Sequence, residues 1–242
     1  MGKHSERGHS RRGLWPGGGA QASAAEAAAR PPAHVHVVEL SVSYGEVVAL
    51  RGVSLSAGPG EFLAVTGHSG AGKTSLINAV AGIVPLAGGH VDLGGGHAPS
   101  AGLDRVAIIP QGNGLASVLT AHENVLAPLR ARGHEAQVAA DRAAEALRSV
   151  GLGESGSHIV EELSGGQQQR AAVARGLALG APVLLADEPT SELDHDNRER
   201  VLALLRAQAD AGAIVIMTTH DPEAAERADR VIQLDDGEVV RG

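Results

Sequence analysis

Apolar residues fall along this chain in two patterns, and each pattern predicts a different kind of strand. Residues 35–40 alternate between apolar and polar side chains, as expected for a strand with one buried face. Residues 183–186 and 214–217 are short and wholly apolar, as expected for parallel strands buried on both faces. A helical pattern over residues 196–209 lies between these two runs. The second half of the chain is therefore predicted to form a parallel sheet with a crossover helix.

The middle of the chain has a different, helical character over residues 113–163. Thr120 and Glu123 have the spacing of a capping box, and residues 135–150 form a predicted helix with Val138, Leu147 and Val150 on one face. Outside this stretch we predict a helix at residues 75–80 and short strands at residues 47–50, 53–55, 61–66, 88–96, 106–111, 231–234 and 238–240, the last two forming a hairpin. The whole pattern predicts a mostly parallel α/β core with a helical insertion in its middle.

Composition narrows the function classes. At 242 residues the chain is long enough for one large domain, or for one domain with an inserted subdomain. The net charge of −8, with no dense basic face, disfavours nucleic-acid binding. Cysteine is absent, which excludes disulfides and thiolate metal sites. The twelve histidines are scattered, and only His34 and His36 have strand-face spacing, so we do not expect them to bind metal.

The first 33 residues are predicted to be a disordered leader, because they are rich in Arg, Gly, Ala and Pro. Arg11 and Arg12 resemble a twin-arginine signal, but Pro16 and a glycine run follow where an apolar segment should be. No stretch approaches the roughly 20 continuous apolar residues of a membrane-spanning helix. We therefore expect any role at a membrane to depend on a partner, with the folded domain over residues 34–242.

The most informative motif is Gly67-His68-Ser69-Gly70-Ala71-Gly72-Lys73-Thr74, between a predicted strand and a predicted helix. Its glycines allow backbone N–H groups to surround a phosphate, and the helix N-terminus adds partial positive charge. Lys73, one of two lysines in the chain, is a slim point charge for β- and γ-phosphates, and Thr74 offers a hydroxyl to Mg²⁺. The alternative is a glycine-rich turn that matches by chance, against which the strand–loop–helix context argues. The segment predicts nucleoside triphosphate binding.

Two carboxylates follow one of the wholly apolar strands. Asp187 ends that strand, where it is expected to lie beside the phosphate loop and to hold Mg²⁺ through water. Glu188 comes next and would orient or deprotonate an attacking water. The alternative interpretation is a strand that ends in an ordinary charged turn. The phosphate-loop motif upstream in the same chain argues against this alternative.

A second candidate phosphate-binding helix end lies at Ser164-Gly165-Gly166-Gln167. Ser164 and Gln167 alone make an ordinary capping box before an alanine-rich helix. Two adjacent glycines, however, weaken a helix by about 1 kcal/mol each, and they favour close approach of a phosphate to the backbone. Two such helix ends for one triphosphate suggest that the second end serves a neighbouring molecule.

Taken together these segments resemble the ATP-binding-cassette (ABC) ATPases, over nearly all of the chain from about residue 35. Residues 163–167 match the signature motif, Gln111 the Q-loop glutamine, residues 191–194 the D-loop, and His220 the switch histidine. Tyr44 falls where this family stacks an aromatic ring on adenine. The resemblance implies an α/β fold with a RecA-like P-loop NTPase core, an antiparallel β-subdomain, and a helical subdomain over about residues 113–163 plus the signature helix to about residue 180.

The resemblance also implies ATP and Mg²⁺ as cofactors and a role for each matched residue. Glu188, His220 and Gln111 are expected in catalysis, with His220 contacting the γ-phosphate. Mg²⁺ is expected at Thr74, Gln111 and Asp187. Nucleotide contacts are expected from Tyr44, Gly67, His68, Ser69, Gly70, Ala71, Gly72, Lys73, Thr74 and Ser75, and across a head-to-tail dimer of two copies from Ser164, Gly165, Gly166, Gln167 and Asp194.

The chain departs from the family pattern at two places. His68 stands where many members carry proline or serine, which should be tolerated because that side chain is not a ligand. After Gln111, residues 112–117 are smaller than the bulkier apolar residues of many relatives. That region faces the membrane partner in the family, so coupling to the partner is the property this departure affects.

Within the family, residues 60–62 and 118–125 resemble the lipoprotein-release and macrolide-export branch. The implied function is an ATP-hydrolysing subunit that powers a separate membrane-spanning permease from the cytoplasmic face of the plasma membrane. The alternative is a soluble ABC-class ATPase that acts on a ribosome, on DNA or on a cell-wall or division complex. A single nucleotide domain and the acidic charge favour transport.

Overall fold

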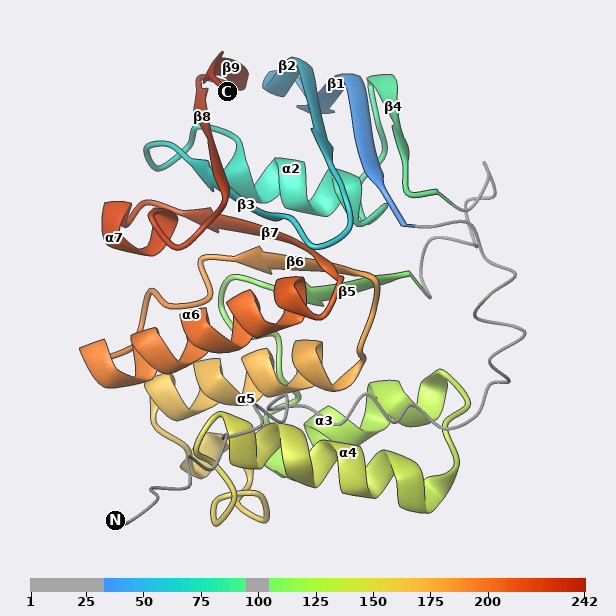
Figure 1. Cartoon of the computed structure of the whole chain (residues 1–242), viewed down its shortest axis with the longest axis vertical. Helices are drawn as coiled ribbons and strands as arrows, with labels where there is room; N and C mark the ends of the chain where they lie inside the picture. The colour runs from blue at the N-terminus through green and yellow to red at the C-terminus, as the bar shows by residue number, and fades with distance from the viewer. Residues whose placement is uncertain (1–32, 95–104) are drawn as a thin grey trace, which may run out of the picture.

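The computed structural model describes residues 33–94 and 105–242. Most of the predicted leader, residues 1–32, lies outside the described residues. The described chain forms a six-stranded sheet of order β5-β6-β7-β3-β8-β9 and a three-stranded sheet of order β2-β1-β4 (Figure 1). None of the helices within these described ranges is both long and apolar enough to cross a bilayer.

The large sheet is parallel except at one edge, as the apolar runs predict. Five of its strands run in one direction, and the last two form the predicted terminal hairpin with antiparallel pairing. Its strands are β3 (Phe62–Thr66), β5 (Val106–Ile109), β6 (Val183–Asp187), β7 (Ile214–Thr219), β8 (Arg230–Asp235) and β9 (Glu238–Arg241). β6 and β7 are buried along their whole length, which explains the apolar runs at residues 183–186 and 214–217.

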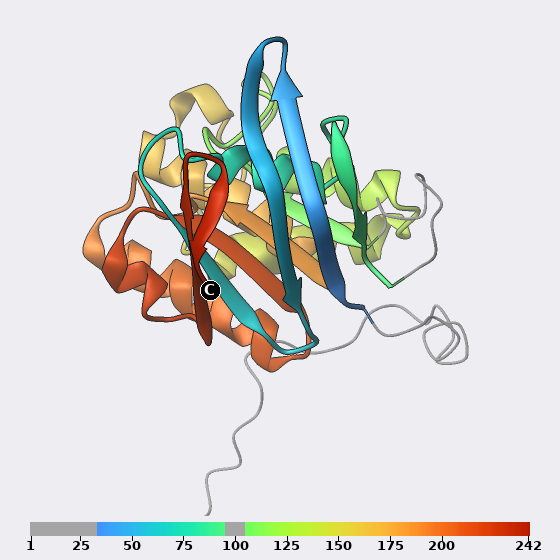
Figure 2. The same cartoon turned by 90° about the horizontal axis from the view of Figure 1, so that it is seen from above.

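The small sheet is antiparallel, and its β1–β2 hairpin projects beyond the rest of the molecule (Figure 2). Its strands are β1 (Val35–Tyr44), β2 (Val47–Ala57) and β4 (Gly88–Asp92). The two short strands predicted at residues 47–50 and 53–55 are one continuous strand, β2, because shifts in its pairing with β1 absorb the break in the apolar pattern. Helix α2 (Lys73–Val80) lies between the two sheets, and its apolar face shares their core.

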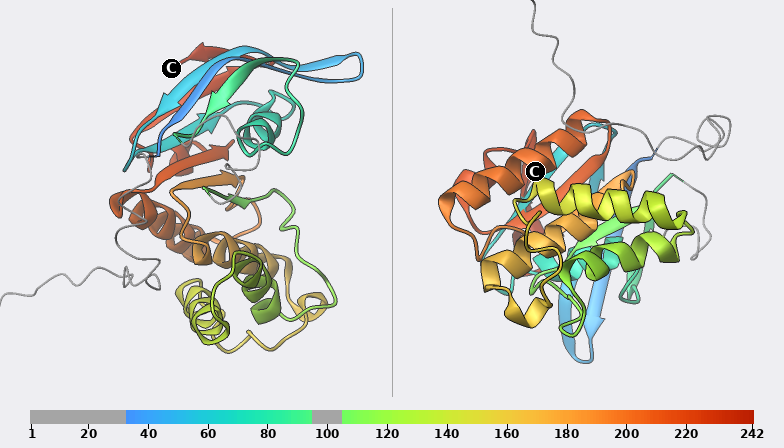
Figure 3. Two further views of the ribbon diagram at one scale, coloured as in Figure 1. Left: turned by 90° about the vertical axis from the view of Figure 1, so that its right-hand side faces the viewer. Right: turned by 90° about the horizontal axis from the view of Figure 1, so that it is seen from below.

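The helical insertion lies between β5 and β6 and forms the opposite end of the molecule (Figure 3). It contains α3 (Ala121–Ala131), α4 (Ala136–Ser149), a short 3₁₀ turn η1 (Val160–Glu162) and α5 (Gly165–Ala178). The chain returns through α6 (His195–Asp210) to β7 and through α7 (Pro222–Ala225) to β8. The capping box at Thr120 and Glu123 is confirmed, with both of its hydrogen bonds present.

Two details of the helical prediction are wrong. The first helix of this stretch begins only at Ala121: Gly112, Asn113 and Gly114 have positive φ angles, which a right-handed helix cannot accommodate, and residues 115–120 are also not helical. On α4, Val138 is only half-buried, whereas Ala139, Ala143 and Ala146 are buried with Leu147 and Val150. Small alanines allow α4 to pack closely on its neighbours, so they rather than the larger Val138 make the buried face.

Candidate active site

The carboxyl ends of four parallel strands meet at one edge of the large sheet. The phosphate-loop motif follows β3, Gln111 lies two residues after β5, Asp187 ends β6, and His220 follows β7. An open cleft of about 840 Å³ lies at this edge. Nine of the residues predicted for the site line it, namely Ser69, Gly70, Gly72, Lys73, Thr74, Ser75, Gln111, Glu188 and His220. Open sheets of this type place ligands at this edge.

Backbone crowding explains two glycines of the motif. Gly72 has φ +101° at the N-cap of α2, and a Cβ atom there would lie 2.6 Å from the Ala49 carbonyl oxygen. A Cβ atom on Gly67 would lie 2.4 Å from the Leu234 carbonyl oxygen. The loop is therefore packed against β2 and the end of β8, and Gly70, which has open space around it, faces outward.

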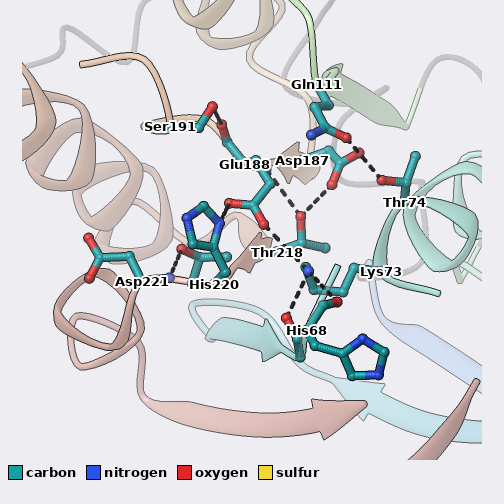
Figure 4. A network of polar contacts seen from close by, with 12 residues as sticks. His68, Lys73, Thr74, Gln111, Asp187, Glu188, Ser191, Thr218, His220 and Asp221 are labelled. Atoms are coloured by element: carbon teal, nitrogen blue, oxygen red, sulfur yellow. Dashed lines mark hydrogen bonds and ion pairs between the residues drawn. The ribbon is translucent and has the colours of Figure 1, made fainter. Parts of the chain in front are cut away.

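Lys73 is the charged centre of the loop and is 8% exposed. Its Nζ donates to the carbonyl oxygens of Gly67 at 2.9 Å and His68 at 3.1 Å, and it lies 3.5 Å from Oε1 of Glu188 (Figure 4). These partners hold the ammonium at the mouth of its own loop. A bound anion at this position could replace them.

A hydroxyl and an amide line the same cleft as Lys73, and a buried carboxylate lies near them (Figure 4). Thr74 Oγ1 lies 3.4 Å from Oε1 of Gln111, which joins α2 to the segment after β5. Asp187 is 2% exposed and does not line the cleft itself. Its Oδ1 accepts a 2.5 Å hydrogen bond from the Thr218 hydroxyl.

Glu188 has an unusual backbone conformation, with φ +49° in a non-glycine residue. Its N–H donates to both the carbonyl oxygen (3.2 Å) and the hydroxyl (3.1 Å) of Thr218, which hold it there. Its Oε2 lies 2.9 Å from Nδ1 of His220, and its side chain is almost wholly buried. The carboxylate therefore lies between an ammonium and an imidazole and faces the cleft (Figure 4).

Sequence reasoning missed several residues of this site. Thr218 touches both acidic residues, yet it is an ordinary polar residue at the end of an apolar strand, and only its place beside β6 reveals its contacts. The cleft is also lined by six residues outside the predicted set: Val47, Val48, Ala49, Arg51, Ser191 and Asp236. Ser191 belongs to the predicted D-loop segment, and its hydroxyl donates to the Glu188 carbonyl oxygen at 3.1 Å.

Some predicted residues lie outside the cleft of this single chain. Tyr44 ends β1 and is 48% exposed; its pairing partner Val47 lines the cleft, whereas Tyr44 does not. Ser164 and Gln167 form the N-terminal capping box of α5, and Gly165 and Gly166 between them belong to its first turn. Asp194 caps α6 and accepts from the Asn197 N–H, which lowers its pKa.

The His68 side chain does not line the cleft and instead contacts the end of β8. Its Nδ1 lies 2.6 Å from the Ser69 carbonyl oxygen, and its Nε2 lies 3.0 Å from Oδ1 of Asp235 and 3.6 Å from Oδ1 of Asp236. The hydrogen bond to Ser69 and the two carboxylates raise the pKa of His68. Among the residues that the structure describes, His68, Asp235 and Asp236 are the one cluster of three such side chains whose ligand atoms lie close enough together to hold a metal ion, and all three are exposed. His34 and His36 are not part of it.

Solved structures of ABC transporter cassettes have a similar overall fold. The dimeric structure of MJ0796, a bacterial ABC transporter cassette, superposes with a TM-score of 0.80 at 32% identity, covering 86% of this chain and 97% of that one. A post-hydrolysis dimer of the same cassette bound to ADP and Pi gives a TM-score of 0.78 with the same coverage and identity. This similarity confirms the predicted fold class.

Sequence relatives agree with the structures. An uncharacterized ABC transporter ATP-binding protein of Mycobacterium tuberculosis is 41% identical over 206 residues, which are 82% of this chain and 62% of that protein. The macrolide export ATP-binding/permease protein MacB of Escherichia coli is 40% identical over 204 residues, 81% of this chain and 32% of MacB. The chain thus spans less than two thirds of the length of these relatives.

The sequence profile described as ABC transporter matches residues 50–191, from β2 through the phosphate loop and the α5 motif to the segment after Glu188. More than half of the chain lies in that match, which includes the cleft residues Lys73, Gln111 and Glu188. The chain belongs to the ABC transporter family.

Proposed function

We propose that this chain is the ATP-binding and ATP-hydrolysing subunit of an ABC exporter. The observation that carries the proposal is the meeting of Lys73, Thr74, Gln111, Glu188 and His220 in one cleft at the carboxyl edge of the parallel sheet. A loop for phosphates, oxygen ligands for a cation and a buried carboxylate are the three parts that phosphoryl transfer to water requires.

The side chains on the α2 side of the cleft suit Mg²⁺. A hydroxyl on Thr74 and an amide oxygen on Gln111 already lie 3.4 Å apart, and the Asp187 carboxylate is held behind them by Thr218. All of these ligand atoms are oxygens, which Mg²⁺ prefers. A carboxylate that binds through water is consistent with Mg²⁺ keeping part of its hydration shell. When bound, Mg²⁺ would neutralise charge on the β- and γ-phosphates.

Glu188 is the proposed general base. A water held between its carboxylate and the γ-phosphate attacks phosphorus; its proton passes to Glu188 while the bond to the β,γ-bridging oxygen breaks and ADP leaves. Lys73 and the loop N–H groups hold the β- and γ-phosphates. His220, 2.9 Å from Glu188 in this structure, contacts the γ-phosphate and fixes the carboxylate's orientation.

A second copy completes each cleft. Ser164 and Gly165 are exposed at the N-terminus of α5, and neither lines the cleft of its own chain. The dimeric structures of MJ0796 support pairing of two copies. In the head-to-tail pair proposed here, the Ser164–Gln167 turn of one copy covers the nucleotide of the other, with Asp194 near both sites and Tyr44 on the adenine. ATP binding would then drive association, and hydrolysis would release it.

The membrane partner is proposed as a permease on a separate chain. The name of MacB, an export ATP-binding/permease protein, supports an exporter-type system. In this arrangement the chain works at the cytoplasmic face of the membrane.

The test is a comparison of steady-state ATP hydrolysis and oligomeric mass for the wild type and Glu188→Gln. We expect the variant to lose at least a hundredfold in kcat, because the amide cannot accept the proton, and to keep its ATP affinity. With ATP and Mg²⁺ it should accumulate as a dimer by light scattering, whereas the wild type should return to monomer as ATP is consumed.

Glu238→Gln is the matched control, since this exposed glutamate on β9 does not line the cleft and the same charge is removed. It should hydrolyse ATP at the wild-type rate. Unimpaired hydrolysis by Glu188→Gln would remove Glu188 from the mechanism, and a wild type that neither binds nor hydrolyses ATP would overturn the proposed function.

A further inference from the structure

The backbone directly after Gln111 is held in a conformation that it would not adopt alone. Gly112, Asn113 and Gly114 have φ angles of +73°, +55° and +56°, three left-handed residues in succession. Glycine tolerates this region, but for asparagine it costs on the order of 1 kcal/mol. Contacts from elsewhere in the fold must therefore fix this segment, and through it the position of Gln111.

Those contacts come from α5, past which the segment runs between β5 and α3 (Figure 1). Arg175 donates from Nη1 to the Gly114 carbonyl oxygen at 2.6 Å and from Nη2 to the Asn113 carbonyl oxygen at 2.8 Å. Burial lowers the pKa of Arg175, and within the described residues no carboxylate pairs with it. Its planar fork therefore serves to bind two consecutive peptide carbonyls, a task that suits arginine and not lysine.

A second side chain on the same face of α5 reinforces this contact. Gln168 lies seven residues before Arg175, two helical turns away. Its Oε1 accepts from Asn113 Nδ2 at 3.1 Å, and its Nε2 donates to the carbonyl oxygens of Val160 and Leu163 at 3.0 Å each. One face of α5 thus holds the residues after Gln111 and the residues directly before Ser164.

The far end of the segment is attached to α3. Asn124 is buried; its Oδ1 accepts from Ala116 N–H at 2.7 Å, and its Nδ2 donates to the carbonyl oxygens of Ala116 and Thr120 at 3.0 Å. Residues 113–120 are therefore fixed to the helical subdomain at both ends. Gln111 sits between this fixed segment and β5 of the parallel core, and its side chain reaches across to Thr74.

We infer that Arg175 is a positioning residue for Gln111: by holding Asn113 and Gly114 on α5 it sets how far Gln111 reaches into the cleft. The same helix carries Ser164 at its N-terminus, so Arg175 joins the glutamine of one site to the turn that serves the neighbouring copy. This inference rests on the proposed function. Arg175 itself touches neither nucleotide nor metal.

The test uses Arg175→Met, which keeps the apolar stem and removes the donors, and Arg175→Lys, which keeps the charge with a single donor group. We expect Arg175→Met to lower kcat about tenfold with KM for ATP changed less than threefold, because the phosphate loop is intact. In a Gln111→Ala background, Arg175→Met should cause no further loss of kcat. A full additional tenfold loss in that background would overturn the inference.

Arg142→Met is the matched control. Arg142 is also partly buried with a lowered pKa and also donates to a backbone carbonyl oxygen, but to that of Ala178 at 2.7 Å, the last residue of α5, and not to the segment after Gln111. It should leave kcat per folded molecule unchanged. A fall in kcat equal to that of Arg175→Met would show that any lost contact to α5 slows the enzyme, and would overturn a specific role for Arg175.

Amide hydrogen exchange supplies a readout independent of activity. The N–H groups of Gly114 and Leu115 bond within the segment, and Arg175→Met should raise their exchange about tenfold while Arg142→Met leaves them protected. Unchanged exchange at these amides would overturn the inference. If the wild type fails to hydrolyse ATP, the proposed function fails while this exchange test still decides whether Arg175 holds the segment.

Should Arg175→Met not fold, Arg175→Lys is measured in its place, with a smaller rise in amide exchange expected.

Discussion

Thr218 contacts both Asp187 and Glu188, the two acidic residues at the end of β6. Its hydroxyl donates to Asp187 and accepts from the Glu188 N–H, and its carbonyl oxygen accepts from that same N–H. It thereby holds a buried carboxylate in place and supports the left-handed backbone of Glu188. One hydroxyl thus positions the proposed metal residue and the proposed base together.

Thr218→Val should therefore damage the site without changing its shape. We expect about 1–3 kcal/mol of lost unfolding free energy, because a buried carboxylate loses its partner, and at least a tenfold lower kcat for ATP hydrolysis. Urea denaturation and steady-state kinetics measure the two effects. Thr219→Val is the control. Thr219 is the next residue and is also buried, but its hydroxyl accepts from the Asp221 N–H and contacts neither Asp187 nor Glu188. Equal kinetic losses in both variants would contradict the role of Thr218.

His68 gives the phosphate loop a pH-dependent attachment. Because its folded pKa is raised, its contribution to stability is fully present below the unfolded value of about 6.5 and is lost as the pH rises through the folded value. The difference in unfolding free energy between wild type and His68→Gln should thus be largest below pH 6.5 and should shrink as the pH rises through the raised folded pKa of His68. Denaturant titrations across this range measure it. A difference that does not vary with pH would contradict the protonated contact to Asp235.

The sequence alone was enough to select the candidate site residues that lie in short, recognisable motifs. Lys73, Glu188 and His220 each follow a strand in a short motif, so their meeting at one sheet edge could be predicted. Thr218 could not be, because its value comes from the pairing of β6 with β7. Nor could the outward turn of His68, which depends on a β8–β9 turn more than 160 residues away.

At the scale of elements, α5 packs unusually close to the sheet. A Cβ atom on Gly176 would lie 2.5 Å from Cγ1 of Ile109 on β5. The helix also carries a run of alanines on its buried side. Alanine composition predicts close packing in general, but which glycine lies at the closest approach depends on the three-dimensional contact with β5.

Gly176→Ala should destabilise the protein even though alanine favours a helix by about 1 kcal/mol over glycine. The clash with Ile109 should cost more than this gain, leaving a net loss of about 1–3 kcal/mol in urea denaturation. Adding Ile109→Ala makes room, so the double variant should be less unstable than the sum of the two single losses. Additive losses would contradict direct contact between the two residues.

At the scale of the whole molecule, the proposed head-to-tail pair would give each chain halves of two different sites. The phosphate loop opens into its own cleft, and the Ser164–Gln167 turn lies outside it. The sequence could suggest this division from two phosphate-receptive helix ends. It could not show the order of the sheet, in which β3 lies between two strands from the far end of the chain.

Two inactive variants should therefore restore activity when mixed. Lys73→Ala lacks a working phosphate loop and Ser164→Arg lacks a working α5 turn, so each homodimer should be inactive. In a head-to-tail heterodimer, one cleft receives Lys73 from one chain and Ser164 from the other. An equal mixture should recover about a quarter of wild-type hydrolysis, since half of the dimers carry one intact site of two. Recovery of no activity, with both variants binding one another, would contradict the shared site.

The phosphate loop is enclosed by the end of the chain. β3 pairs with β7 on one side and with β8 on the other, the N–H of Gly237 donates to the Ala71 carbonyl oxygen, and the Arg51 N–H donates to that of Gly237. During synthesis the loop emerges some 160 residues before these partners, and such long-range pairing forms late. A nascent chain that has exposed its whole Gly67–Thr74 segment but not residues 214–237 therefore still lacks the strands and the turn that hold the phosphate loop in place.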